Sequence, residues 1–130
     1  MHLAEYFESH TGLGVLATSD KQGRVDVAVY ARPHVIDDET IAFIMRERLS
    51  HKNLQSNPHA AYLFREDGPG YRGKRLYLTK IREETNQALI AQMSRHDKNI
   101  NPPGDDAQRY LVHFKIETIR PLIGEQALNE

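Results

Sequence analysis

The chain has 130 residues, 39% of them hydrophobic and none of them cysteine, so it can bury one core but excludes disulfides, thiolate metal sites and a cysteine nucleophile. Its formal net charge of -1 argues against a general nucleic-acid or membrane-surface binder. There is neither an apolar run of the roughly 20 residues that a membrane span needs nor a signal peptide at residues 1–8, so we expect one cytoplasmic domain over residues 1–130.

The first part of the chain predicts a short helix and then two hairpins. The helix covers about residues 3–9 and places Leu3, Tyr6 and Phe7 on one face. Strands at 14–18 and 25–30 flank the turn 20–23, which Asp20 opens and Gly23 closes in the left-handed region. Strands at 34–36 and 40–45 form the second hairpin.

The second part predicts three more strands and one helix. Strands at 60–64 and 75–79 are joined by a loop, 65–74, that is too rich in glycine and proline to be regular. We expect Thr85 to cap a helix that carries an apolar stripe. Residues 98–106 are expected to form a loop and residues 109–119 the last strand. We expect one face of that strand to be buried and the other, with His113, Lys115 and Glu117, to be half solvated.

Successive hairpins with only short helices between them predict a mainly β fold. This order favours an antiparallel Greek-key barrel over a parallel sheet built from strand-helix-strand units.

One stretch predicts an anion site. The apolar strand 41–45 is followed by Arg46 and Arg48, and then by Ser50, a good N-cap residue for a helix beginning near His51 and ending before Pro58. Free amides at a helix start, the positive end of the helix dipole and nearby cations together favour a phosphate, and a phosphorylated cofactor is the natural candidate. The alternative is a solvated strand end in which Ser50 only caps the helix.

Other chemistry finds little support in the sequence. The seven histidines show no metal-ligand spacing, so no metal site is predicted, and the chain lacks nucleophile-elbow, Walker and dinucleotide motifs. Tyr30, Tyr62, Tyr71 and Tyr77 could stack on a planar ring, but tyrosines at strand spacing are more often core or cross-strand residues.

The order of these segments resembles the pyridoxamine 5'-phosphate oxidase-related family of FMN-binding split barrels. The resemblance runs through residues 15–28, 38–43 and 50–63, and its most specific part is Ser50-x-Lys52-Asn53-Leu54 followed by Asn57-Pro58 and an apolar strand. It implies an FMN-binding split β-barrel and a homodimer with the flavin in a groove at the subunit interface.

The resemblance also implies which residues hold the cofactor. Lys52 and Arg46 would bind the FMN phosphate, with hydrogen bonds from Ser50 and Asn53. The implied cofactor-binding residues are Tyr30, Ala31, Arg32, Met45, Arg46, Ser50, His51, Lys52, Asn53, Lys74 and Arg75. Since the flavin supplies the redox chemistry, no catalytic residue is assigned.

The sequence therefore predicts a flavin-dependent oxidoreductase that acts on an unidentified small molecule or electron donor. Two alternatives stay open: a non-catalytic flavin store or electron carrier with the same site, and a barrel that binds heme instead. The true vitamin B6 oxidases have a longer C-terminal region that supplies arginine and histidine to the substrate phosphate, whereas here only residues 120–130 follow the last strand. We expect no efficient oxidation of pyridoxamine phosphate.

Overall fold

A computed structural model describes residues 2–94 and 108–124, and its centre is one antiparallel sheet in the order β2-β1-β5-β6-β7-β4-β3. The elements are α1 (Leu3–Ser9), β1 (Gly12–Ser19), β2 (Val25–Val29), β3 (His34–Val35), β4 (Thr40–Arg46), α2 (Leu49–Ser56), β5 (His59–Glu66), β6 (Gly73–Glu84), α3 (Gln87–Ser94) and β7 (Arg109–Pro121).

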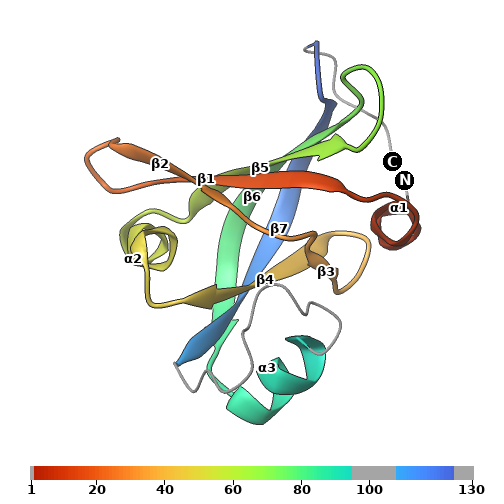
Figure 1. Cartoon of the computed structure of the whole chain (residues 1–130). Helices are drawn as coiled ribbons and strands as arrows, with labels where there is room; N and C mark the ends of the chain where they lie inside the picture. Colours follow the sequence, from red (N-terminus) through yellow and green to blue (C-terminus); the bar gives the residue numbers. More distant parts are fainter. Residues whose placement is uncertain (1, 95–107, 125–130) are drawn as a thin grey trace.

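The sheet is bent into a barrel that stays open along one side. Its strand order places β2 at one end and β3 at the other, next to β4. Figure 1 shows β4 crossing below β1 and β2, with α2 between the two layers. Helix α2 contacts β1, β2 and β4, so it bridges the opening instead of covering a closed face. This arrangement confirms the predicted split barrel.

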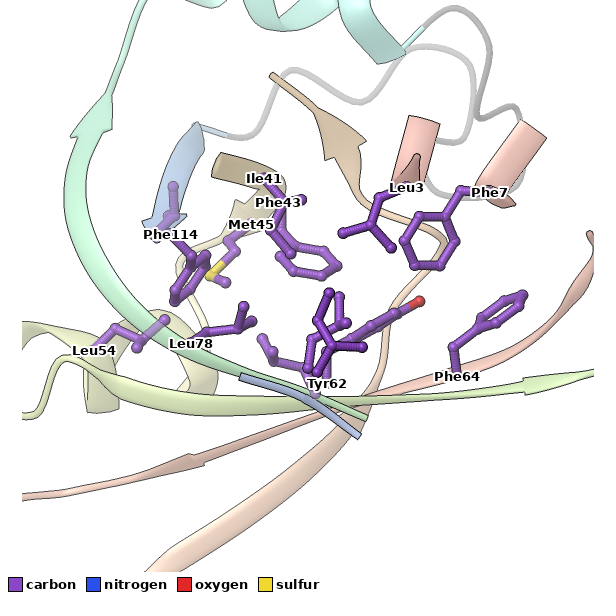
Figure 2. Packing of buried hydrophobic residues seen from close by; sticks show 14 residues of the cluster. Leu3, Phe7, Ile41, Phe43, Met45, Leu54, Tyr62, Phe64, Leu78 and Phe114 are labelled. Carbon is purple, nitrogen blue, oxygen red and sulfur yellow. The ribbon is translucent and has the colours of Figure 1, made fainter. Parts of the chain in front are cut away.

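Aliphatic and aromatic side chains together fill the barrel interior. Tyr62, Phe64 and Phe114 are fully buried, and the rings of Phe43 and Tyr62 have centroids 4.9 Å apart. Figure 2 shows α1 contributing Leu3 and Phe7 at one end of this cluster, while Leu54 of α2 lies at the other. The alternating burial of β5 and β6 reflects one face turned to this core and one turned outward.

The local turn chemistry partly follows the prediction. Gly23 has a φ of 84°, and Asp20 Oδ1 accepts hydrogen bonds from the Gln22 and Arg24 amides, so the first hairpin turn is confirmed. Helix α3 is capped by Asn86, whose Oδ1 accepts from the Leu89 amide, and not by Thr85. The loop predicted at 98–106 lies outside the described residues.

The prediction for His113 on the last strand is wrong. His113 is only 3% exposed, because α3 packs on this side of the barrel above Ala42 and Leu111. Both of its ring nitrogens are buried without a hydrogen-bond partner among the described residues. Burial lowers the pKa of His113 below 6.5, and the nearby Arg82 lowers it further against the opposing effect of Glu84.

Candidate ligand cavity

The opening of the barrel contains a cavity of about 600 Å³. Its walls are the edge strand β2, the start of β1, the end of β4 and the first turn of α2. The lining residues are Gly12, Leu13, Gly14, Asp26, Val27, Ala28, Val29, Tyr30, Ala31, Ile44, Arg46, Arg48, Leu49 and Ser50.

Strand β2 presents an open backbone edge to this cavity. It pairs only with β1 in the sheet, with Val15 opposite Val29 and Ala17 opposite Val27. The Tyr30 amide donates to the Gly14 carbonyl at 3.0 Å. Since backbone groups of an antiparallel strand alternate in direction, those of Val27 and Val29 point away from β1. The cavity therefore offers both donors and acceptors along one wall.

The start of α2 supplies the cationic part of the cavity. The helix begins at Leu49, two residues earlier than predicted, and its first internal hydrogen bond runs from the Lys52 amide to the Arg48 carbonyl at 3.0 Å. The amides of residues 49–51 precede that bond and are the orphan donors of a helix start. Arg46 and Arg48 line the same space. Helix dipole, amides and guanidinium groups together favour an anion.

Contrary to the prediction, Ser50 does not cap α2 but ties the helix to Tyr30, the residue that follows β2. It lies inside the first turn, is 3% exposed and is hydrogen-bonded to the Tyr30 side chain. Burial raises the pKa of Tyr30, although the Ser50 hydrogen bond and the Arg48 charge oppose the shift. Tyr30 is therefore a neutral phenol at physiological pH.

Tyr62 fixes the far end of the β2 wall. Its buried hydroxyl donates to the carbonyls of Tyr30 and Ala31 at 3.2 and 3.1 Å, and burial raises its pKa. Gly14 makes room for this arrangement, because a Cβ there would collide with the Tyr62 hydroxyl and the Tyr30 carbonyl oxygen. The sequence prediction missed Gly14, since nothing in its local pattern separates it from other strand glycines.

Lys52 and Asn53 line a neighbouring cavity of about 530 Å³, which shares Leu49 and Asp26 with the first. Asn53 is buried, and its Nδ2 donates to Thr18 Oγ1 at 3.1 Å, so this side chain joins α2 to β1. Lys52 is exposed and lies one helical turn from Arg48.

The His51 side chain lies in a different environment, among groups from β6 and β7. It stacks on Tyr110 with ring centroids 3.9 Å apart, and its Nε2 is 3.1 Å from Glu83 Oε2. Burial alone would raise the pKa of Glu83, but hydrogen bonds from Lys80, Gln55 and His51 outweigh it and hold the value at about 2. Only the His51 backbone belongs to the anion-favouring helix start.

The remaining predicted residues lie away from the cavity. Arg32 donates to the carbonyls of Phe7 and His10 at 2.6 and 2.8 Å, and Met45 is a core residue with 1% exposure. The Lys74 ammonium lies 4.5 Å from the centroid of the Tyr6 ring, and Arg75 Nε donates to the Pro121 carbonyl at 2.9 Å. Of the predicted cofactor-binding set, the cavity brings together Tyr30, Ala31, Arg46 and Ser50, beside Arg48 of the predicted anion site, and it adds Val27 and Val29.

An apolar surface borders the cavity on the outer face of the sheet. Val25, Val27 and Val29 are 81%, 66% and 72% exposed. In register across the sheet, Val29 is followed by Val15 and Leu63, and Val27 by Ala17, Ala61 and Tyr77. We call this set, together with Leu13, the outer apolar face.

The described residues support neither a metal site nor a membrane-spanning helix. Among residues 2–94 and 108–124, no three histidine or acidic side chains are placed to hold a metal ion. None of the helices in these ranges is both long and apolar enough to cross a membrane.

The chain matches no protein-family model and no curated protein sequence, but its fold has well-matched solved structures. An FMN-binding protein from Syntrophomonas wolfei subsp. wolfei superposes with a TM-score of 0.74 and 18% identity, over 92% of this chain and 83% of the other. An F420 reductase superposes with a TM-score of 0.72 and 21% sequence identity, over 89% of this chain and 94% of the other.

A third structure is a Clostridium acetobutylicum protein related to general stress protein 26 of B. subtilis, described as belonging to the pyridoxinephosphate oxidase family. It gives a TM-score of 0.71 and 13% identity, over 97% of this chain and 89% of the other. The chain therefore has the split-barrel fold of pyridoxamine 5'-phosphate oxidase-like proteins.

Proposed function

We propose that this chain is an FMN-binding flavoprotein and acts as a flavin-dependent oxidoreductase on a small-molecule substrate or electron donor. The observation that carries the proposal is the cavity in the barrel opening, where an open strand edge faces a helix start flanked by Arg46 and Arg48. The names of the matched FMN-binding and F420 proteins support the same class of ligand.

The residues present fit such a cofactor. The phosphate would be held by the backbone amides at the start of α2, including that of Ser50, and by the side chains of Arg46 and Arg48. Lys52 follows in the same helix and lines the neighbouring cavity. The unpaired backbone groups of Val27 and Val29 would form hydrogen bonds with the polar edge of the flavin ring. The side chains of these two valines would shield the ring from water. Bound FMN would supply the transfer of electrons, while the protein binds, orients and shields it.

We also propose that the protein is a homodimer formed through the outer apolar face. Val25, Val27 and Val29 lie side by side on one face of an edge strand, and each is more than 60% exposed. Exposing so much apolar surface to water is unfavourable and promotes association. The cavity and this face share Leu13, Val27 and Val29, so a second subunit on the face would border the ligand.

A comparison of FMN with riboflavin tests the phosphate assignment. Each charge-assisted hydrogen bond to the phosphate contributes roughly 1.5–3 kcal/mol, so FMN should bind far more tightly in a fluorescence titration. Lys52→Ala and Arg48→Ala should each weaken FMN binding about tenfold or more, which corresponds to a loss of about 1.4 kcal/mol. Lys115→Ala, at an exposed position on β7, is the matched control. Equal affinities for FMN and riboflavin would contradict the assignment of the phosphate site.

Two further measurements separate the alternatives. Steady-state turnover with NAD(P)H and an electron acceptor distinguishes an enzyme from a flavin store or carrier. The visible spectrum of the purified protein distinguishes bound flavin from bound heme.

A further inference from the structure

The connection between β4 and α2 is a tight turn centred on Glu47 (Figure 1). The Arg48 amide donates to the Arg46 carbonyl at 2.8 Å, two residues back, which is the hydrogen bond of a γ-turn. Glycines alone have a positive φ in the described ranges, so this is the inverse form that is common at strand ends. Helix α2 follows at once, because the Lys52 amide donates to the Arg48 carbonyl. The conformation of this one turn therefore sets the position of both arginines.

The turn separates its three charged side chains. Arg46 and Arg48 line the ligand cavity, whereas Glu47 between them does not. Glu47 instead contacts two ring side chains: its Oε1 lies 3.3 Å from His51 Nδ1, and its Oε2 accepts a hydrogen bond from the Tyr110 hydroxyl. The Tyr110 hydrogen bond, assisted by His51, lowers the pKa of Glu47 below 4.5, so this side chain is a carboxylate at neutral pH.

The two rings that hold Glu47 are themselves fixed. Those of His51 and Tyr110 stack with centroids 3.9 Å apart, and His51 is only 4% exposed. His51 Nε2 lies 3.1 Å from Glu83 Oε2 on β6, and Lys80 Nζ lies 2.7 Å from the other oxygen of the same carboxylate. Tyr110 is held in β7 opposite Met45 of β4. Glu47 is thus anchored to a support built from α2, β6 and β7.

We propose that Glu47 is a positioning residue for the flavin phosphate, because its carboxylate holds the γ-turn in the form that presents Arg46 and Arg48 to the cavity. The inference rests on the proposed flavin site and deepens it. Glu47 would act through the two arginines without touching the cofactor. Its side chain is 67% exposed, so its hydrogen bonds contribute little to the overall stability of the fold.

Glu47 has two opposing effects on a phosphate bound at this turn. As a negative charge between two arginines, it repels the anion and offsets part of their attraction. As a hydrogen-bond acceptor, it orders the backbone that carries the arginines and so reduces the conformational freedom lost on binding. Water and salt screen the repulsion, since the carboxylate is largely exposed, and the ordering effect is therefore the larger one. Removing Glu47 should weaken phosphate binding although it removes a negative charge.

Fluorescence titrations of Glu47→Ala with FMN and with riboflavin test this assignment. We expect the affinity for FMN to fall about fivefold, as for the loss of one ordinary hydrogen bond, and that for riboflavin to change less than about twofold. Glu47→Gln keeps an acceptor for Tyr110 and His51, so it should retain most of the affinity for FMN. Glu117→Ala, which removes another exposed carboxylate on β7, is the matched control and should change neither affinity.

Tyr110→Phe tests the same contact from its other end. It should weaken FMN binding in the same direction, and adding it to Glu47→Ala should cause no further loss, since both substitutions break one hydrogen bond.

Unchanged or tighter FMN binding by Glu47→Ala would overturn the proposal. An equal loss of affinity for FMN and riboflavin would overturn it too, because that result indicates general damage to the cavity. Failure of the wild-type protein to bind FMN would instead overturn the proposed function, and the positioning role with it.

Discussion

Replacing Tyr62 by phenylalanine should loosen the wall of the ligand cavity without changing the shape of the core. Tyr62 is fully buried, and its hydroxyl donates to the carbonyls of Tyr30 and Ala31, which follow β2. The variant keeps the ring but removes the hydrogen-bond donor from these partly buried carbonyls, which lowers the free energy of unfolding by about 1 kcal/mol. For a chain of this size, each kcal/mol lowers the melting temperature by about 4 °C.

Urea unfolding followed by circular dichroism measures the loss, and an FMN titration measures the consequence at the site. We expect Tyr62→Phe to be less stable and to bind FMN more weakly, since the end of β2 is no longer fixed. Tyr71→Phe is the matched control, because it removes an exposed hydroxyl and should change neither value. A Tyr62→Phe variant as stable as wild type would refute the assigned role of this hydroxyl.

Three further predictions concern charge and assembly. Glu83 has its pKa lowered from 4.5 to about 2, so it stabilises the fold above pH 4.5 and loses that contribution as the pH falls toward 2. Glu83→Gln should remove this pH dependence from acid denaturation curves. Since the pKa of buried His113 is lowered from 6.5, wild-type stability should fall as the pH drops below 6.5, and His113→Leu should flatten that part of the curve. Val27→Glu should yield monomers in sedimentation equilibrium with unchanged monomer stability, and a dimeric variant would exclude the outer apolar face as the interface.

The fold was largely predictable because its strands carry strong local signals. The continuous apolar run of β5, the alternating apolar residues of β7 and the Asp20–Gly23 turn determine the strand positions with little help from distant residues. The helix start after Arg48 was predicted two residues late, since Ser50 has the chemistry of a cap but is drawn into a tertiary hydrogen bond with Tyr30.

The site was less predictable because it depends on contacts between distant segments. Arg32 has the charge of a ligand-binding residue, but it is paired with carbonyls of the first helical segment. His51 immediately follows a cavity residue in sequence, yet the helical rotation turns its ring toward Glu83. The role of Gly14 depends on Tyr62, which lies 48 positions further along the chain. Such relations cannot be read from local periodicity.

Reconstitution with FMN determines whether this chain is an FMN-binding protein. The purified protein should be saturated with FMN, freed of excess cofactor by gel filtration, and examined by visible absorption together with a protein assay. We predict a bound flavin spectrum at about one FMN per chain, with riboflavin largely lost in a parallel experiment. Protein that emerges without flavin after saturation with FMN would contradict it.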